Sequence, residues 1–194
     1  MATAVGFKQL TIRILNGEKP VLDDNIFIIK GDKNKGATSS AKISGLSPEV
    51  IKTYGSNKVY NISGKGTGDV KIDFDVIDIP EKIKDKILGY QVDEDTGVVR
   101  VTSDTQAPDC SVLLEDYIPS GEAIMLGFAT GIFSYDGNEW NTKEEKGKEL
   151  AAESLSFAAG SADDGLTLSK YIGDKSEGIA AVKADLQMTM ETPK

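Results

Sequence analysis

The sequence predicts a mostly β protein: an antiparallel β-sandwich or barrel of about seven strands, with one flanking α-helix from Pro80 to Leu88. Three observations predict this class. Short apolar segments with a period of two recur along the chain, turns containing glycine or asparagine separate them, and strands do not alternate regularly with helices. A doubly wound parallel sheet would require that alternation, so an antiparallel arrangement is favoured.

Two strands are predicted before residue 30. From Gly6 to Leu15 the chain alternates, with apolar side chains at every second position from Leu10 onward. A turn at Asn16-Gly17 follows, and the all-apolar run 26–29 predicts a short strand that is buried on both faces.

Residues 30–68 lack such a pattern. Gly, Ser, Thr, Asn and Lys dominate this interval, and Ser47-Pro48 interrupts any regular element. A polar segment of this length is more typical of a functional loop or arm than of a plain connection. The sequence therefore predicts a single domain over residues 1–194 with a long arm at 30–68, and we expect mobile N- and C-termini.

The clearest strand and the clearest helix follow each other. From 69 to 76 apolar and charged residues alternate without interruption, which is typical of a strand with one wet face. Asp78 is expected to cap the next helix, Pro80 and Glu81 favour its start, and Gly89 suits its end. The apolar side of the strand comprises Val70, Ile72, Phe74 and Val76, and the apolar stripe of the helix comprises Ile83, Ile87 and Leu88.

The second half of the chain predicts a hairpin over 90–101, with an acidic turn that ends in Gly97, and strands at 111–114, 123–135 and 154–158. The longest strand, from Ala123 to Tyr135, is apolar on both sides. It is therefore expected to lie between two packed layers or to contact another subunit. Trp140 and a charged connector over 141–148 follow it.

The C-terminal segment allows two interpretations. Ile179, Val182 and Leu186 have helical spacing among good helix formers, which favours a helix from about Ser176. The alternation of Leu186 with Met188 and Met190 leaves a strand as the alternative.

The composition indicates a soluble globular chain, with 39% hydrophobic and 27% charged residues. No apolar run approaches the ~20 residues of a membrane span, and the first six residues do not resemble a signal peptide. Cys110 is the single cysteine and cannot form an internal disulfide, so a reducing cytoplasm is expected during folding. The net charge of −9 disfavours specific nucleic-acid binding. A local surplus at Lys30, Lys33, Lys35 and Lys42 is interpreted as a solvated loop, since no aromatic residues are interleaved.

The sequence predicts no catalytic, cofactor or metal site. Histidine is absent, which removes the usual general base and the commonest metal ligand. The glycine-rich segment from Gly64 to Gly68 lacks the spacing of a phosphate-binding loop and precedes a strand, so it is interpreted as a hinge. The acidic segments Asp93-Glu94-Asp95 and Asp163-Asp164-Gly165 do not continue into a twelve-residue calcium loop and are interpreted as turns.

Asp73 and Asp75 raise the question of a glycosidase. They share one strand face, about 7 Å apart by strand rise, a separation that such an enzyme could use. Lys71 on the same face, and the lack of a nearby aromatic platform for a sugar, favour a solvated strand face. Cys110 has no histidine partner and follows Asp109, which would raise the pKa of its thiol, so it is interpreted as structural.

Five segments occur in a fixed order along the chain: 6–10 (GFKQL), 35–46 (KGATSSAKISGL), 66–71 (GTGDVK), 87–90 (ILGY) and 142–146 (TKEEK). Together they resemble the major tail proteins, or tail tube proteins, of long-tailed bacteriophages and prophages of Gram-positive bacteria. The resemblance extends over nearly the whole chain. Its weight comes from the number and order of the segments, because none of them is chemically diagnostic.

The resemblance implies a structural virion protein that is not an enzyme. It implies a β-sandwich flanked by a helix, self-assembly into homohexameric rings, and stacking of those rings into a tail tube that conducts DNA without binding it specifically. The implied partners are other copies of the chain, the tape measure protein, the tail terminator and the distal tail protein. The implied location is the phage tail, after synthesis in the cytoplasm of the bacterial host and without a membrane.

Expectations for subunit contacts combine this resemblance with the residue patterns. The arm at 30–68 is expected to reach neighbouring rings, where its apolar residues would become buried. The strand 123–135 is expected to pair with the next subunit and remove an exposed edge. The acidic surplus predicts a lumen past which DNA slides. The predicted contact residues are Lys35, Ala37, Thr38, Lys42, Ile43, Leu46, Tyr54, Met125 and Phe133.

Two other classes of function stay open at this level. A capsid decoration or adhesion module would also be a β-domain, but it would favour trimers or monomers and would not need the arm. A carbohydrate hydrolase would use Asp73 and Asp75, for which the sequence offers no supporting groups.

Overall fold

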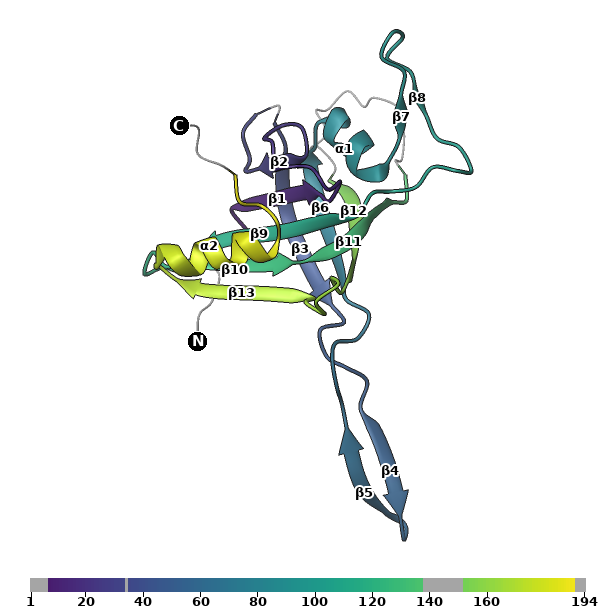
Figure 1. Ribbon diagram of the computed structural model, residues 1–194, viewed down its shortest axis with the longest axis vertical. Coiled ribbons are helices and arrows are strands. Elements are labelled where there is room, and N and C mark those ends of the chain that lie inside the picture. The colour runs from purple at the N-terminus through teal and green to yellow at the C-terminus, as the bar shows by residue number, and fades with distance from the viewer. Residues whose placement is uncertain (1–6, 34, 138–151, 191–194) are drawn as a thin grey trace, which may run out of the picture.

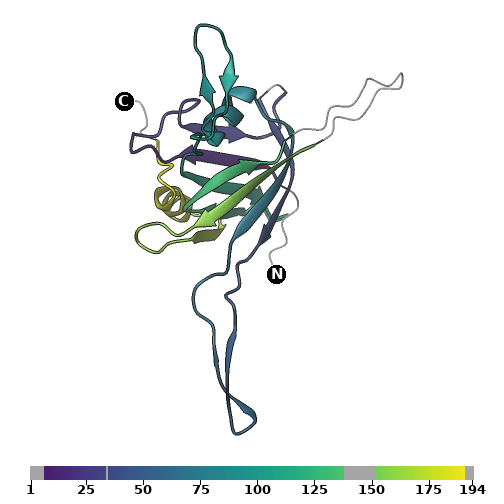
Figure 2. The same cartoon turned by 90° about the vertical axis from the view of Figure 1, so that its right-hand side faces the viewer.

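Two antiparallel sheets pack face to face, and a helix covers the outer face of one of them (Figures 1 and 2). The computed structural model describes residues 7–33, 35–137 and 152–190. The prediction of a mostly β, antiparallel sandwich is confirmed, and within the described residues the sheets do not close into a barrel. Trp140 and the connector 141–148 lie outside the described residues. Residues 1–6 and 191–194, which belong to the termini that are expected to be mobile, also lie outside them.

Sheet A has five strands in the order β13-β10-β9-β1-β2, and sheet B has four in the order β11-β12-β6-β3. All neighbours within them are antiparallel. The strands of sheet A are β1 (Gln9–Ile14), β2 (Ile26–Ile29), β9 (Cys110–Tyr117), β10 (Ala123–Phe128) and β13 (Leu168–Gly173). Those of sheet B are β3 (Ala37–Ser44), β6 (Lys71–Asp78), β11 (Thr130–Tyr135) and β12 (Glu153–Gly160).

Two separate ribbons project from this sandwich, and two helices lie against it (Figure 1). The ribbons consist of β4 (Ile51–Gly55) with β5 (Lys58–Ser63), and of β7 (Gln91–Val92) with β8 (Val99–Arg100). The helices are α1 (Glu81–Leu88) and α2 (Ser176–Asp185). Among the residues that the structure describes, neither helix is long and apolar enough to cross a membrane.

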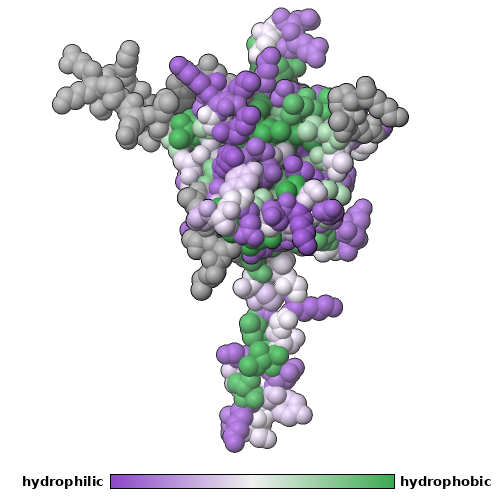
Figure 3. Space-filling model, turned by 90° about the vertical axis from the view of Figure 1, so that its left-hand side faces the viewer, coloured by the Kyte–Doolittle hydropathy of each residue, from purple (hydrophilic) through white to green (hydrophobic). Residues whose placement is uncertain are grey.

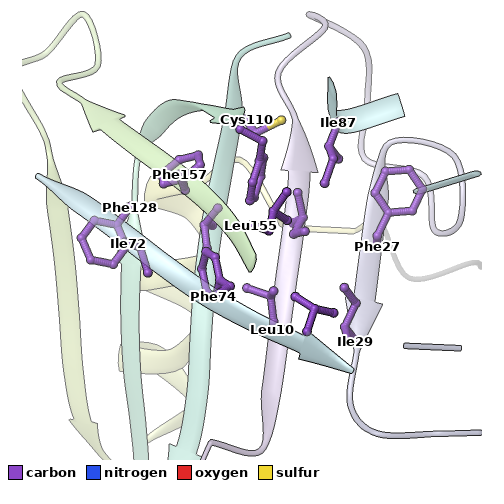
Figure 4. Packing of buried hydrophobic residues seen from close by; sticks show 14 of the residues in the cluster. Leu10, Phe27, Ile29, Ile72, Phe74, Ile87, Cys110, Phe128, Leu155 and Phe157 are labelled. Atoms are coloured by element: carbon purple, nitrogen blue, oxygen red, sulfur yellow. The ribbon is translucent and has the colours of Figure 1, made fainter. Parts of the chain in front are cut away.

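The main core lies between the two sheets. Side chains from the inward faces of both sheets and from α1 point toward one another there (Figure 4). The ring of Phe133 lies 6.3 Å from that of Phe74 and 4.8 Å from that of Phe157, measured between centroids. Aromatic rings attract at these distances. The apolar side predicted for residues 69–76 is confirmed, because Val70, Ile72, Phe74 and Val76 are all buried in this core.

A second core, the α2 core, lies on the other face of sheet A. The helix predicted from about Ser176 is confirmed and covers this face, and the alternative strand does not form. Gly127 of β10 permits the close packing, since a Cβ atom there would lie 2.5 Å from the side chain of Leu186. The buried members are Ile26, Leu113, Met125, Val182, Leu186 and Met188.

The apolar run from Ala123 to Tyr135 is divided, although the sequence predicts one strand. The break falls at Ala129: β10 before it belongs to sheet A, and β11 after it belongs to sheet B. The chain therefore passes from one sheet to the other at this corner. β10 lies between the main core and the α2 core, which explains why it is apolar on both faces. Of the two predicted explanations, packing between two layers and contact with another subunit, the first applies to β10.

The interval 30–68 contains three strands where the sequence indicated no regular element. β3 completes sheet B, and β4 and β5 form a separate ribbon. β3 was missed because its inward side chains are small or few: Ala41 and Ile43 are the partly buried residues that pack on the core. Inward and outward side chains do alternate along β3, but the two sets differ little in hydrophobicity. The sequence also gave no indication of β13, which is short and pairs with β10.

Helix α1 closes one end of the sandwich. Its C-terminal Gly89 is left-handed as predicted, with φ of 71°, and a Cβ there would lie 2.0 Å from a backbone oxygen of Gln106. The predicted cap at Asp78 is wrong: Asp78 ends β6, and Pro80 occupies the N-cap without a side-chain hydrogen bond. The proline fixes the entry angle of the helix instead.

Buried charges hold α1 against sheet B. The Lys84 ammonium lies 2.9 Å from Glu81 and 3.3 Å from Glu153, and 5.0 Å from the centre of the Tyr135 ring. Burial alone would lower the pKa of Lys84, but the hydrogen bond to Glu81 and the charge of Glu153 outweigh it, so this pKa is raised. Burial and the nearby charge of Glu81 raise the pKa of Asp85.

We expect Asp85→Asn to raise the melting temperature of the unassembled subunit at pH 7. A carboxyl whose pKa is raised by folding binds its proton more tightly in the folded state, so its ionised form opposes folding. The advantage of the variant should shrink as the pH falls toward and below 3.8, the ordinary pKa of an aspartate. Thermal unfolding followed by circular dichroism from about pH 7.5 down to about pH 3.5, close to the ordinary aspartate pKa, measures this.

Asp93→Asn is the matched control. Hydrogen bonds from Arg100 and Thr96 lower the pKa of Asp93, so its ionised form favours folding. This substitution should lower the melting temperature only slightly at pH 7, because the pair with Arg100 is exposed, and the small loss should disappear at low pH. An Asp85→Asn variant that melts below the parent at pH 7 would contradict the expectation.

Candidate assembly surfaces

The most prominent surface is an arm, which we define as residues 45–68 and which carries the β4–β5 ribbon. It extends away from the sandwich along the long axis of the molecule (Figures 1 and 2). Its two legs come together at a narrow base. There a Cβ on Gly45 would lie 1.8 Å from the Asp69 oxygen, and a Cβ on Gly68 would lie 2.8 Å from the Ser47 oxygen. Glycine at both positions is what permits the legs to approach so closely.

Every residue of β4 and β5 is exposed, yet many of them are apolar. Exposure reaches 84% at Tyr60, 68% at Tyr54 and 67% at Ile51. Figure 3 shows hydrophobic side chains gathered along the arm. A water-exposed apolar surface of this kind on a ribbon without a core of its own is typical of a binding surface.

Both faces of the arm contribute apolar side chains. Opposed residues in an antiparallel ladder share a face. Tyr54 is opposite Val59, and Ile62 is opposite Lys52, so these side chains lie on one face. Tyr60 lies on the other, beside Gly55, where a Cβ would be 3.5 Å from that of the tyrosine. The ribbon can therefore be covered from two sides.

The outer face of sheet B is a second candidate surface, and it is mostly polar. Apart from the exposed Ile132, its residues form cross-strand rows of small or charged side chains, because the inward positions of the same strands are taken by the main core. The rows are Ser44–Lys71–Ala158–Ile132, Lys42–Asp73–Ser156–Ser134 and Ser40–Asp75–Ser154.

The charges on this face are locally balanced. Asp73 lies 2.8 Å from the Lys71 ammonium and accepts a hydrogen bond from Ser156 at 2.7 Å. These two hydrogen bonds lower the pKa of Asp73. Asp75 accepts a hydrogen bond from Ser40. The lowered pKa of Asp73 does not suit it to act as the general acid of a glycosidase, a role that requires a raised pKa.

A third surface is the valine hairpin, defined as residues 90–101 and including β7 and β8. It projects at the end of the molecule opposite the arm (Figures 1 and 2). Val92 and Val99 are opposed in its ladder and share one face. The exposed apolar residues are Val92, Val98, Val99 and Val101.

Asp93 stabilises the turn of the valine hairpin through a hydrogen bond and an ion pair within the hairpin. Asp93 accepts a hydrogen bond from the Thr96 backbone N–H and lies 3.0 Å from Arg100. In the second acidic segment Asp164 accepts from the Leu166 N–H, and Gly165 has a φ of 85°. Both segments are turns in the structure, and the described residues contain no group of acidic or cysteine side chains arranged for a metal ion.

The remaining candidates from the sequence are the glycine-rich segment, the surplus lysines and Cys110. Gly66 and Gly68 belong to one leg of the arm, and the surplus lysines lie on the β2–β3 connection and on β3. Cys110 is buried in the main core, where burial and the charge of Asp109 raise the pKa of its thiol to about 12. Such a thiol is protonated and unreactive at neutral pH.

The predicted contact residues separate into two groups. Lys35, Ala37, Thr38, Lys42, Ile43, Leu46 and Tyr54 lie on or beside edge strand β3 or on the arm. Met125 and Phe133 are buried, in the α2 core and the main core respectively. These two side chains are therefore not on the surface of the subunit.

Sequence reasoning missed Val59, Tyr60 and Ile62 of the arm. The sequence feature that could have indicated these residues is the run of β-forming residues from 58 to 63, which follows the Ser56-Asn57 turn. Both turn residues have positive φ, of 50° and 62°, as a tight two-residue hairpin requires. Serine is uncommon in this conformation, which conceals the turn in the sequence.

A protein-family model described as a phage tail tube protein matches residues 5–178. This interval includes both sheets, the arm, the valine hairpin and the start of α2. Comparisons with curated proteins and with solved structures find no match.

Proposed function

This chain belongs to the phage tail tube protein family, and from that premise we propose that six copies form a ring and that the rings stack into a tube that conducts DNA during ejection. The observation that carries the proposal is the arm. Its apolar residues are exposed on both faces in the single chain, and a neighbouring subunit would bury them. Burial of one such side chain contributes roughly 1.5–3 kcal/mol.

The edges of sheet B support the formation of rings. β3 and β11 each have one hydrogen-bonded neighbour in the sheet, so their outer sides are available to strands of adjacent copies. Pairing β3 of one copy with β11 of the next would continue the sheet around a closed ring. Closure removes exposed edges, which otherwise promote aggregation.

We assign the polar outer face of sheet B to the lumen. DNA passes easily through a channel when no cluster of cations holds its phosphates. On this face Lys42 and Lys71 offset the charges of Asp73 and Asp75, and the ion pair between Lys71 and Asp73 holds two of these opposite charges together. The proposed lining is thus locally neutral and hydrogen-bonded, in place of the strongly acidic lining that the net charge of the chain suggested.

Further parts of the proposal follow from the family. The protein acts structurally and catalyses no reaction, resides in the virion tail after synthesis in the host cytoplasm, and contacts the tape measure protein, the tail terminator and the distal tail protein. Long-tailed phages of Gram-positive bacteria are the proposed source.

Electron microscopy of the purified protein at high concentration tests the proposal. We expect rings and tubes, and class averages viewed along the axis should show six-fold symmetry. Tail initiator components are added in a second series, because a subunit can wait for a nucleating complex. Particles that stay monomeric in both series would refute the proposal, and trimers that bind capsids would favour the decoration module.

A further inference from the structure

The arm and the valine hairpin lie at opposite ends of the molecule. In both views the arm extends from one end of the sandwich and the valine hairpin from the other (Figures 1 and 2). When two copies are stacked along this axis in the same orientation, the arm of one approaches the valine hairpin of the next. A contact between two different patches does not close on itself and can be repeated without limit.

The two projections have opposite charges. Residues 51–63 contain Lys52 and Lys58 and no carboxylate, giving a formal charge of +2. Residues 90–101 contain the three acidic residues 93–95 and one arginine, giving −3 + 1 = −2. Like charges at either end would oppose stacking, whereas these charges attract and set the register of the contact.

The apolar surfaces of the two projections also match. Val92 and Val99 lie side by side on the valine hairpin, and Tyr54 and Val59 lie side by side on the arm. All four side chains are exposed in the single subunit. Aromatic side chains against β-branched ones are favourable pairs on strand surfaces.

The reach of the arm is sufficient for a contact between rings. At ~3.3 Å per residue, the leg from Gly45 to the turn at Ser56 spans at most ~35–40 Å. The arm extends away from the sandwich along the long axis of the molecule over this length (Figures 1 and 2). The arm can therefore pass beyond its own ring.

We propose that the arm of one subunit docks on the valine hairpin of a subunit in the adjacent ring, which brings the positive charge of the arm, at Lys52 and Lys58, close to the acidic turn at 93–95. The inference rests on the proposed ring stacking and names the acceptor of the arm. Another possible acceptor is the groove of about 410 Å³ between α2 and sheet A, which is lined by apolar residues such as Ile28, Ile179 and Met190. That groove lies on the side of the sandwich, beneath α2, and it includes Glu115 and Lys183, so it offers no net charge to the arm.

Charge exchange tests the proposal. One variant carries Lys52→Glu and Lys58→Glu, a second carries Glu94→Lys and Asp95→Lys, and a third carries all four substitutions. All four positions are exposed, so circular dichroism should show an unchanged fold. The readout is the critical concentration for tube growth, measured by sedimentation and electron microscopy at low salt.

We expect each double variant to raise the critical concentration at least ~10-fold, and the fourfold variant to return to within about 3-fold of the parent. The proposal is overturned if either double variant polymerises as readily as the parent, or if the fourfold variant grows no better than the weaker of the two. A parent that forms no rings or tubes at all would instead refute the proposed function, so the two failures can be told apart.

Crosslinking provides the second measurement. Tyr60→Cys and Val98→Cys are combined in one chain, and assembled tubes are treated with a short bismaleimide. The native Cys110 is buried and should not react. Because the two introduced thiols lie at opposite ends of one subunit, crosslinks between rings should produce a ladder of long oligomers on a denaturing gel.

The matched control combines Tyr60→Cys with Glu177→Cys, which places the second thiol on the exposed surface of α2. This variant should give no ladder. A ladder from the α2 variant and none from the Val98 variant would overturn the proposal and assign the arm to the groove beneath α2.

Discussion

Removal of the arm is expected to abolish tube growth while the subunit stays folded. The variant joins Gly45 to Gly68 through Asn-Gly, a dipeptide that favours tight hairpin turns. The two glycines already lie close together at the base of the arm, so the new connection is short and unstrained. The sandwich should keep its melting temperature within a few degrees, because β4 and β5 contribute nothing to either core.

The expected loss is large because the arm has no other way to bury its apolar side chains. If two of them become buried per contact, the contact contributes roughly 3–6 kcal/mol, or about 10²–10⁴-fold in the critical concentration. Negative-stain electron microscopy and sedimentation measure tube length and the soluble fraction. Rings without stacking are compatible with the expectation, since ring closure uses the edges of sheet B.

A variant with a full-length arm controls for the change in loop length. It carries Tyr54→Thr, Tyr60→Thr and Ile62→Thr, which keep the β-propensity of the ribbon and remove its apolar surface. This variant should also fail to form tubes. Normal tubes from either variant would show that the arm is not the stacking element.

Replacement of Arg13 by methionine is expected to cost on the order of 3 kcal/mol or more of the free energy of unfolding. Arg13 lies on β1 and is only 1% exposed. Its guanidinium donates hydrogen bonds to the backbone oxygens of Ile14, Glu18, Asn25 and Gln187 and to the side chain of Asn16.

These contacts explain the size of the effect. The guanidinium connects three segments: β1, the β1–β2 connection and the residues that follow α2. Methionine fills similar volume but leaves the acceptor oxygens buried without donors, and each unsatisfied group costs about 1–3 kcal/mol. Burial lowers the pKa of Arg13, although arginine stays charged at any pH of interest.

Urea unfolding of the unassembled subunit measures this difference. The control is Arg100→Met on the valine hairpin, where the arginine is exposed and pairs with Asp93. An exposed pair contributes little, so the control should unfold at nearly the parental urea concentration. Equal midpoints for the two variants would contradict the structural role of Arg13.

The elements with strong local patterns could be predicted from sequence. The alternation over 69–76, the proline and glycine that bracket α1, and the glycine turn of the valine hairpin all form where local chemistry indicated. The helix from Ser176 was also correct, because residues with good helix propensity extend over several turns. These features depend on neighbouring residues alone.

The prediction failed where partners distant in sequence decide the outcome. Arg13 alternates with apolar residues as the polar side of a strand would, yet α2 and the residues after it cover that face of sheet A. The run from Ala123 to Tyr135 reads as one strand because its hydrophobicity is continuous, and only the pairing of its halves with β9 and β12 divides it at Ala129. Met125 and Phe133 were predicted as contact residues because this run is continuously hydrophobic in the sequence.

The sequence by itself determined that this protein is a mostly β chain, because alternation and turns are local properties. The tertiary structure decided where the apolar residues go. It buries Met125 and Phe133 inside the subunit and leaves Tyr54, Tyr60 and Ile62 in water. The physical reason is that exposure depends on which layers pack over a strand, and those layers are set by contacts between segments far apart in the chain.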